Sequence, residues 1–184
     1  MEFQGKTITL KDGRTAILRA PDPDRDAEAM VRYLPEVLGE TYFMLRYPEE
    51  QRITAEKEHG ILERSIAAED EMLILCEVEG QIVGSSHISF MTSRIKTRHR
   101  ASVGIALRQA YWNQGIGTAM MRELIDVARQ REGVEQIELQ YIEGNTRARA
   151  LYEKLGFRIA GIIPDAVKLK DGTLLNEYHM ILKL

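Results

Sequence analysis

The chain has 184 residues, 44% apolar and 29% charged, with 25 Lys and Arg against 28 Asp and Glu. The net charge of −3 argues against a nucleic-acid partner, and the single cysteine, Cys76, excludes an intrachain disulfide and a cysteine-based zinc cluster. We therefore expect one domain over residues 1–184, with no metal and no membrane span. Residues 1–6 lack an apolar signal core, so we expect a cytoplasmic protein.

The apolar pattern predicts short strands that alternate with amphipathic helices. Two β-branched runs flank residues 11–14, where Asp-Gly favours a hairpin turn. Further strands are predicted at 72–78, 81–90, 101–107, 136–142, 157–163 and 177–184. Helices are predicted at 25–38, 54–68, 114–131 and 146–155. The expected class is α+β, with a mixed, mostly antiparallel sheet of about six to seven strands and about four helices.

A glycine pair opens the third predicted helix. Gly115-Ile116-Gly117 follows a strand and a short loop. Glycines let the backbone come close to a ligand, and the first free N–H groups and the positive dipole end of a helix suit a phosphate. Taken alone, the pair is equally typical of a tight turn between a strand and a helix.

The fourth predicted helix carries a second motif. Asn145 is placed to cap it, and Gly156 follows its end. Taken alone, Tyr152 on this helix is typical of a half-buried packing residue.

The two motifs together are more specific. Gly-x-Gly followed by Asn-x-x-Ala-x-x-Leu-Tyr-x-x-x-Gly-Phe resembles the GNAT superfamily of acetyl-CoA-dependent N-acyltransferases. The resemblance covers residues 72–157 well and the N-terminal helices in outline. It implies a three-layer GNAT-like fold and transfer of an acetyl group from acetyl-CoA, a co-substrate, to a primary amine. The amine would belong to a small molecule, a peptide or a protein, and would attack directly in a ternary complex.

The resemblance also implies roles for individual residues. Ile105 and Leu107 would pair with the pantetheine arm, with help from Asn145. The amide of Leu107 would stabilise the developing oxyanion, and Tyr152 would protonate the leaving thiolate. Backbone amides would hold the diphosphate, namely those of Gln114, Gly115, Ile116, Gly117 and Thr118. Trp112 departs from the family pattern, which usually has Arg or Gln at this position.

The general base stays open at this point. Glu40 in the loop after the first helix, Glu143 and His87 are candidates, and deprotonation through water is an equal alternative. Each candidate has an ordinary structural interpretation, as a solvated loop charge or a strand histidine.

Other side chains favour ordinary roles. Arg147 and Arg149 lie near enough in sequence to meet phosphates, but we interpret both as exposed helix residues. We interpret Cys76, inside an apolar strand, as an inert core thiol.

The acceptor is the least defined part of the prediction. Segments 39–50 and 92–100 are expected to border its pocket. The family resemblance also implies a homodimer, although no residue identifies an interface. The alternative hypothesis is a CoA-binding sensor or regulatory module that kept the fold and lost catalysis.

Overall fold

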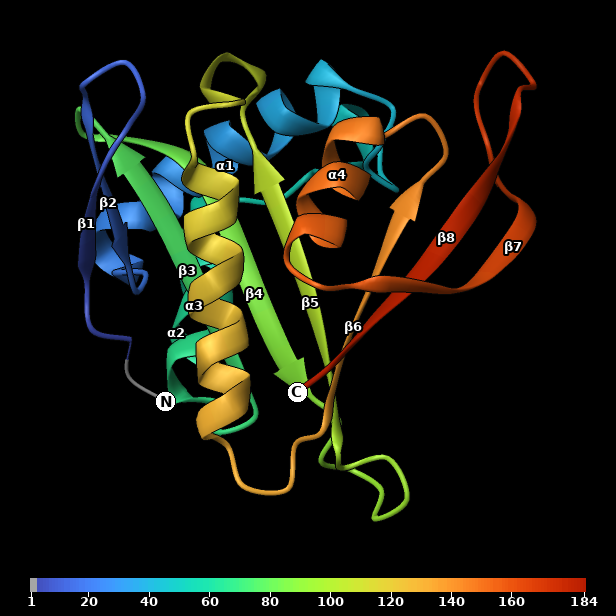
Figure 1. Cartoon of the computed structure of the whole chain (residues 1–184). Helices are drawn as coiled ribbons and strands as arrows, with labels where there is room; N and C mark the ends of the chain where they lie inside the picture. Colours follow the sequence, from blue (N-terminus) through green and yellow to red (C-terminus); the bar gives the residue numbers. More distant parts are fainter. Residues whose placement is uncertain (1–2) are drawn as a thin grey trace.

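The computed structural model describes residues 3–184, and Met1 and Glu2 of the N-terminal stretch lie outside the described residues. Its strands form one sheet in the order β1-β2-β3-β4-β5-β6-β8-β7 (Figure 1). Neighbouring strands are antiparallel except β5 and β6, which are parallel. The α+β prediction is confirmed, with eight strands instead of six to seven because the hairpins at both ends of the chain join the same sheet. The strands are β1 (Lys6–Thr9), β2 (Thr15–Arg19), β3 (Glu71–Val78), β4 (Gln81–Phe90), β5 (Arg100–Leu107), β6 (Gln136–Ile142), β7 (Arg158–Lys168) and β8 (Leu174–Lys183).

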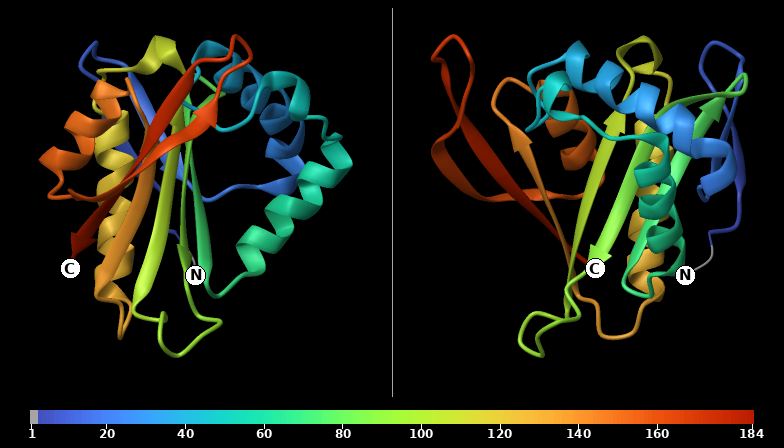
Figure 2. Two further views of the ribbon diagram at one scale, coloured as in Figure 1. Left: turned by 90° about the vertical axis from the view of Figure 1, so that its right-hand side faces the viewer. Right: turned by 180° about the vertical axis from the view of Figure 1, so that it is seen from behind.

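Helices cover both faces of the sheet. Helices α1 and α2 lie on one face and α3 and α4 on the other, which gives three layers (Figure 2). The α-helices are α1 (Pro23–Glu40), α2 (Ala55–Ala67), α3 (Ile116–Gln130) and α4 (Thr146–Lys154), and short 3₁₀ turns occupy Pro48–Glu50 and Gln109–Tyr111. Within residues 3–184, no helix combines the length and apolar character needed to cross a bilayer.

Side-chain caps explain where three of the helices begin. Asp22 accepts from the amide of Arg25, Thr54 from that of Lys57, and Asn145 from that of Ala148. Each cap satisfies one of the backbone donors that a helix leaves unpaired at its N-terminus. Helix α1 continues two residues beyond the predicted end, so Glu40 is its last residue and does not lie in a loop.

Strands β5 and β6 are paired at one end and diverge along the rest of their length. Only Arg100, Ala101 and Ser102 of β5 pair with β6, at Gln136 to Glu138. Beyond Ser102, β5 keeps its pairing with β4 and β6 keeps its pairing with β8. The sheet therefore opens toward the C-terminal ends of these two strands, and this opening decides where a ligand can lie.

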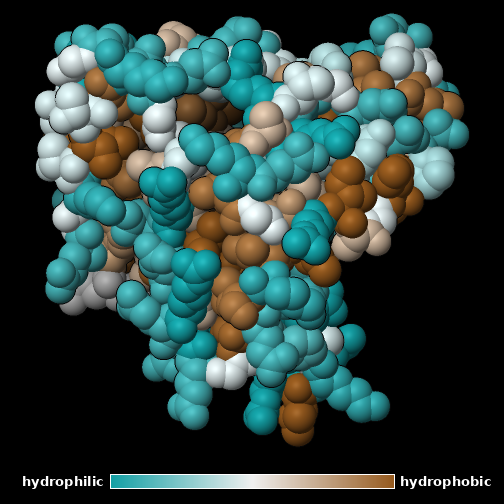
Figure 3. Space-filling view, in the orientation of Figure 1, coloured by the Kyte–Doolittle hydropathy of each residue, from teal (hydrophilic) through white to brown (hydrophobic). Residues whose placement is uncertain are grey.

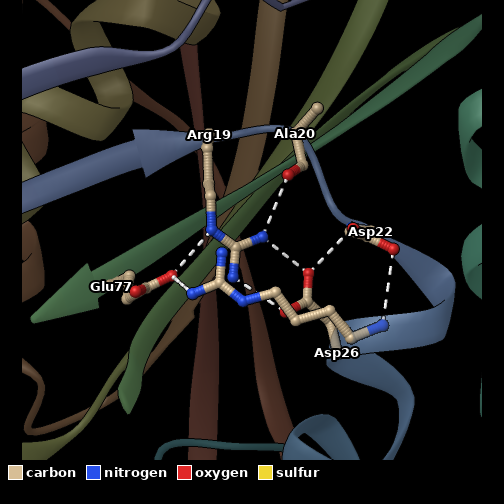
Figure 4. A network of polar contacts seen from close by, with 6 residues as sticks. Arg19, Ala20, Asp22, Asp26 and Glu77 are labelled. Atoms are coloured by element: carbon tan, nitrogen blue, oxygen red, sulfur yellow. Dashed lines mark hydrogen bonds and ion pairs between the residues drawn. The ribbon is translucent and has the colours of Figure 1, made fainter. Parts of the chain in front are cut away.

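A group of paired charges fastens α1 to the sheet (Figure 4). Arg19 on β2 donates to both carboxylate oxygens of Asp26, at 2.6 and 2.7 Å, and to Glu77 on β3 at 2.8 Å. Arg25 adds a second donor to Glu77, at 2.6 Å. Asp26 is only 1% exposed, so its charge depends on these partners.

The pKa of Asp26 reflects two opposed effects. Burial alone would raise it, but the hydrogen bonds from Arg19 and from the amide of Asp22, together with the charge of Arg19, hold it below its usual value. A carboxyl group whose pKa is lowered on folding stabilises the fold above its unfolded pKa, about 3.9. That contribution is lost as the pH falls through the lower, folded-state pKa.

We expect Asp26→Ala to lower the free energy of unfolding by about 3 kcal/mol, because Arg19 loses its main buried partner. Urea unfolding followed by circular dichroism measures this. Arg25→Ala removes a half-exposed member of the same group and should cost about 1 kcal/mol or less. Asp26→Asn should also flatten the decline in stability below about pH 5, and an unchanged decline would contradict the role given to this carboxylate.

Candidate active site

A cavity of about 630 Å³ lies at the C-terminal end of β5, where β5 and β6 separate. It is lined from both faces of the sheet, by the end of α1 and the segment after it, by the first two turns of α3 and by α4 along its length. Figure 3 shows a hollow with apolar residues at its floor near the upper ends of α3 and α4. The cavity is thus accessible from the α3/α4 face and extends through the opening in the sheet toward α1.

Backbone amides of β5 face this opening. The amide of Arg108 donates to the carbonyl of Val83 on β4, at 2.9 Å. Because donors alternate in direction along an antiparallel strand, the N–H groups of Ile105 and Leu107 point away from β4, toward the gap. The carbonyl of Leu107 points the same way and accepts from the indole N–H of Trp112 at 2.8 Å. Ile105 and Leu107 line the cavity, as the predicted pantetheine contact requires.

Helix α3 begins without a side-chain cap, unlike α1, α2 and α4. Its N-cap is Gly115, at φ 96° in the left-handed region that favours glycine. Gly115, Gly117 and Thr118 line the cavity, so the free N–H groups of the first turn meet it at the positive end of the helix dipole. The side chain of Gln114 accepts from the amide of Asp12, and the side chain of Ile116 is fully buried. The diphosphate contacts predicted for these two residues involve their backbone amides and stay predictions.

Arg147 lies over Trp112, with its guanidinium carbon 3.9 Å from the ring centroid, and both line the cavity. Arg147 is an exposed helix residue, as predicted, but it also lies at the cavity, where it could meet a phosphate. The guanidinium of Arg147, in the first turn of α4, thus lies over Trp112, the position where the resemblance implies Arg or Gln. Arg149, in contrast, points outward and pairs with Glu153 at 2.8 Å.

Tyr152 reaches the cavity from α4. It is only 6% exposed, packs against Tyr141 and Phe157, and its hydroxyl has no hydrogen-bond partner among residues 3–184. Burial raises the pKa of Tyr152 to about 12. The phenol therefore stays protonated in the neutral range, as a proton donor must. Asn145 lies beside it on the cavity wall and caps α4.

Glu40 reaches the cavity from the other face of the sheet. Tyr33, on the same side of α1, donates to the carbonyl of Ala106 at 2.9 Å and so fixes the helix against β5. Glu40 accepts from the amide of Gln109 at 2.6 Å, and its other oxygen lies 3.7 Å from Nε of Arg108. Of the carboxylates predicted as bases, Glu40 is the one that lines the cavity.

The other candidate bases lie away from it. Glu143 accepts from the amide of Asn176 on β8 at 2.9 Å. His87 packs on Gly104, in the middle of the β4–β5 pair. Neither residue lines the cavity. Cys76 is buried, and burial raises the pKa of its thiol to about 12, which fits an inert core thiol.

One predicted border of the acceptor pocket is wrong. The segment 92–100 joins β4 to the start of β5, whereas the cavity lies at the end of β5. Eight strand residues separate the two, about 23 Å at the usual rise of a strand. The segment after α1 does border the cavity, through Thr41, Phe43 and Met44.

Sequence reasoning missed several cationic residues at the cavity. Lys11 lies in the β1–β2 turn, and Arg122 and Lys154 lie on α3 and α4. The turn reaches the cavity because Gln114 holds Asp12 and because Lys6 pairs with Glu123 of α3. No local pattern indicates such a contact between residues about a hundred positions apart. Arg122 could have been found from its position between one and two turns after the glycine pair on α3, whereas Lys154 ends the neighbouring helix α4.

Comparison with known proteins identifies the family of this chain. The sequence profile described as the acetyltransferase (GNAT) family matches residues 33–157, more than half of the chain. The chain belongs to the GNAT acetyltransferase family. It is 31% identical over 110 residues to the L-amino acid N-acetyltransferase AaaT of Escherichia coli, which covers 60% of this chain and 66% of that protein. It is 33% identical over 84 residues to the ribosomal protein bS18-alanine N-acetyltransferase of E. coli, covering 46% and 56%. The chain thus spans less than two thirds of either relative.

Solved structures of this family share the fold over almost the whole chain. An acetyltransferase of the GNAT family from Streptococcus pneumoniae superposes with a TM-score of 0.84 at 25% identity, covering 92% of this chain and 99% of that one. The yncA protein of Salmonella typhimurium, a putative acetyltransferase solved with its cofactor acetyl-CoA, gives 0.75 at 20% identity, covering 91% and 92%. The second likeness concerns the fold alone. The predicted GNAT-like architecture is confirmed.

Gly115→Ala tests the glycine at the start of α3. A Cβ there would meet no atom within 4 Å, so the cost comes from the left-handed backbone alone. We expect a loss of about 1–2 kcal/mol in the free energy of unfolding, measured by urea denaturation. Gly161→Ala is the matched control, because its Cβ also meets open space and its φ is not positive. Equal effects of the two substitutions would contradict the backbone explanation.

Proposed function

We propose that the protein is an acetyl-CoA-dependent N-acetyltransferase that acetylates a primary amine by direct attack within a ternary complex. The observation that carries this proposal is the pair of open donor sets on one cavity. The uncapped first turn of α3 offers amides to a diphosphate, and Ile105 and Leu107 offer amides to an extended, amide-bearing chain. An acetyl donor with a diphosphate at one end and pantetheine along its length, as in acetyl-CoA, fits both sets of amides.

Each of these donor groups has a distinct role. The first turn of α3 binds the diphosphate, with Arg147 and Trp112 beside it. The amides of Ile105 and Leu107 orient the pantetheine as an added strand would be oriented. The thioester supplies an activated carbonyl and a thiolate leaving group. The amide of Leu107 donates to the carbonyl oxygen as negative charge develops there during attack by the amine.

Two proton transfers are needed, and side chains on opposite faces of the sheet carry them out. An alkyl ammonium must lose a proton before it can attack, and Glu40 takes it, directly or through one water. The new bond joins nitrogen to the acetyl carbon, and the carbon–sulfur bond breaks. Tyr152 gives its proton to the leaving sulfur and regains one from the solvent or from the amide nitrogen as that group forms.

Tyr152→Phe should reduce kcat about 100-fold and leave KM for acetyl-CoA within about threefold, because it removes a proton donor and little surface. Thiol release with a panel of primary amines provides the measurement. Since burial raises the pKa of Tyr152 to about 12, its ionisation should cause no fall in kcat between pH 7 and pH 10. A large loss of CoA affinity with unchanged kcat would assign Tyr152 to binding instead of catalysis.

Arg147→Ala should weaken CoA about tenfold in calorimetry, because it removes a charge-assisted contact to phosphate worth roughly 1–2 kcal/mol. It should leave transfer from a truncated acetyl thioester without diphosphate, such as S-acetylpantetheine, unchanged. Arg149→Ala on the same helix is the control, and it should alter neither quantity since Arg149 pairs with Glu153. An equal loss of transfer from acetyl-CoA and from S-acetylpantetheine would show that Arg147 stabilises α4 and does not contact the phosphate.

A further inference from the structure

The two ends of the cavity differ in charge. Its lining cations come from the β1–β2 turn, α3 and α4, and these are Lys11, Arg122, Arg147 and Lys154. The end lined by α1 and the segment after it contributes Val37, Glu40, Thr41, Phe43 and Met44. Helix α1 and the α3/α4 pair cover opposite faces of the sheet (Figure 2). The cavity therefore presents cations on one side and a carboxylate among mostly apolar groups on the other.

The carboxylate end carries net negative charge. Arg108, next to the last cavity-lining residue of β5, lies between Glu36 at 2.8 Å and Glu40 at 3.7 Å. Two carboxylates thus face one guanidinium, whose charge is already matched. Glu40 keeps a defined orientation because it also accepts from the amide of Gln109. A charge within a few ångström of such a carboxylate is favoured if it is positive and disfavoured if it is negative.

The cavity lining next to Glu40 is mostly apolar. Val37, Phe43 and Met44 line this end, and Tyr42 packs on Phe43 with ring centroids 4.5 Å apart. The Tyr42 hydroxyl lies against Gly144 in the turn between β6 and α4, where a Cβ would collide with it. The segment after α1 therefore reaches across to the far side of the opening in the sheet, beside the apolar residues of the cavity.

We infer that the acceptor is a primary amine on an apolar group, with no carboxylate next to the amine. The inference rests on the proposed acetyl transfer and adds the class of acceptor. The ammonium lies toward Glu40, and the apolar group occupies the space between Val37, Phe43 and Met44. The carboxylate of a free amino acid would enter the negative end, where Arg108 is already paired with Glu36 and Glu40. The inferred class therefore differs from the L-amino acids in the name of the AaaT relative.

Matched acceptors test this class directly. 2-Phenylethylamine and phenylalanine differ by one carboxylate, as do 3-(methylthio)propylamine and methionine. We expect kcat/KM, measured by thiol release and expressed per fraction of free amine, to be at least tenfold higher for the amine of each pair. Equal or higher values for phenylalanine and methionine would overturn the inference.

A charge-neutral variant identifies the group responsible. Glu40→Gln retains an oxygen that can accept from the Gln109 amide, and it should reduce the preference for the amine over the amino acid at least fivefold. The ratio of two kcat/KM values cancels any common loss of rate caused by removing a base. Glu50→Gln is the control, because Glu50 accepts from the amide of Tyr47 and does not line the cavity. An unchanged ratio in Glu40→Gln would contradict the electrostatic argument.

The same panel separates the two levels of the proposal. If amino acids are acetylated as efficiently as the amines, the acceptor class is wrong and acetyl transfer stands. If neither member of either pair is acetylated while another primary amine is, the acceptor class is wrong and acetyl transfer stands. If no primary amine of a wider panel is acetylated although CoA binds in calorimetry, the proposed transfer itself is contradicted. Acetylation of the amines alone supports both.

Discussion

The separation of β5 from β6 is the constraint on which the site depends. Three residues of β5 pair with β6 and the rest do not, so the outward amides of Ile105 and Leu107 have no strand to meet. Exposed, unpaired donors inside a sheet are costly unless a ligand or water satisfies them. The fold tolerates this opening because each strand keeps a full partner on its other side, β4 for β5 and β8 for β6. The opening is therefore built into the topology and does not depend on any one side chain.

Anchors at its rim keep the opening in shape. On one side, Tyr33 ties α1 to the carbonyl of Ala106, while Arg19 and Asp26 hold the beginning of the same helix on the sheet. On the other side, the indole of Trp112 fixes the loop before α3 to the carbonyl of Leu107. Two consecutive carbonyls of β5 are thus held by side chains from opposite faces of the sheet. The C-terminal end of β5 is therefore held in place where the carbonyl of the proposed thioester would have to lie.

Local sequence patterns predicted the elements and the backbone part of the site. Caps such as Asn145, the glycine pair at α3 and the position of Tyr152 on α4 follow from interactions within a few residues, which a single sequence displays. The contacts of Arg147 and Lys11 depend on how distant elements pack, and no periodicity encodes that. Glu143 is a residue that the sequence wrongly suggested for the site, again because distant pairing is not visible in it. It is close to the cavity in sequence, but the pairing of β6 with β8 directs its carboxylate to the amide of Asn176.

The charge distribution gives the near-neutral composition a physical meaning. A net charge of −3 says nothing of where charges lie. The cavity gathers three cations from α3 and α4 and a fourth, Lys11, from the β1–β2 turn, while α1 contributes a carboxylate. In the proposed acetyl transfer, such a gradient would orient two substrates of opposite sign before they meet, an anion on one face and an ammonium on the other. Trp112 stands at the position where the resemblance implies Arg or Gln, and the cation at this place is Arg147 of α4, which lies on the indole. The position of Arg147 therefore depends on an aromatic ring whose N–H donates to the backbone of β5. Loss of the ring would thus affect both the phosphate end, through Arg147, and the reacting end, through Leu107.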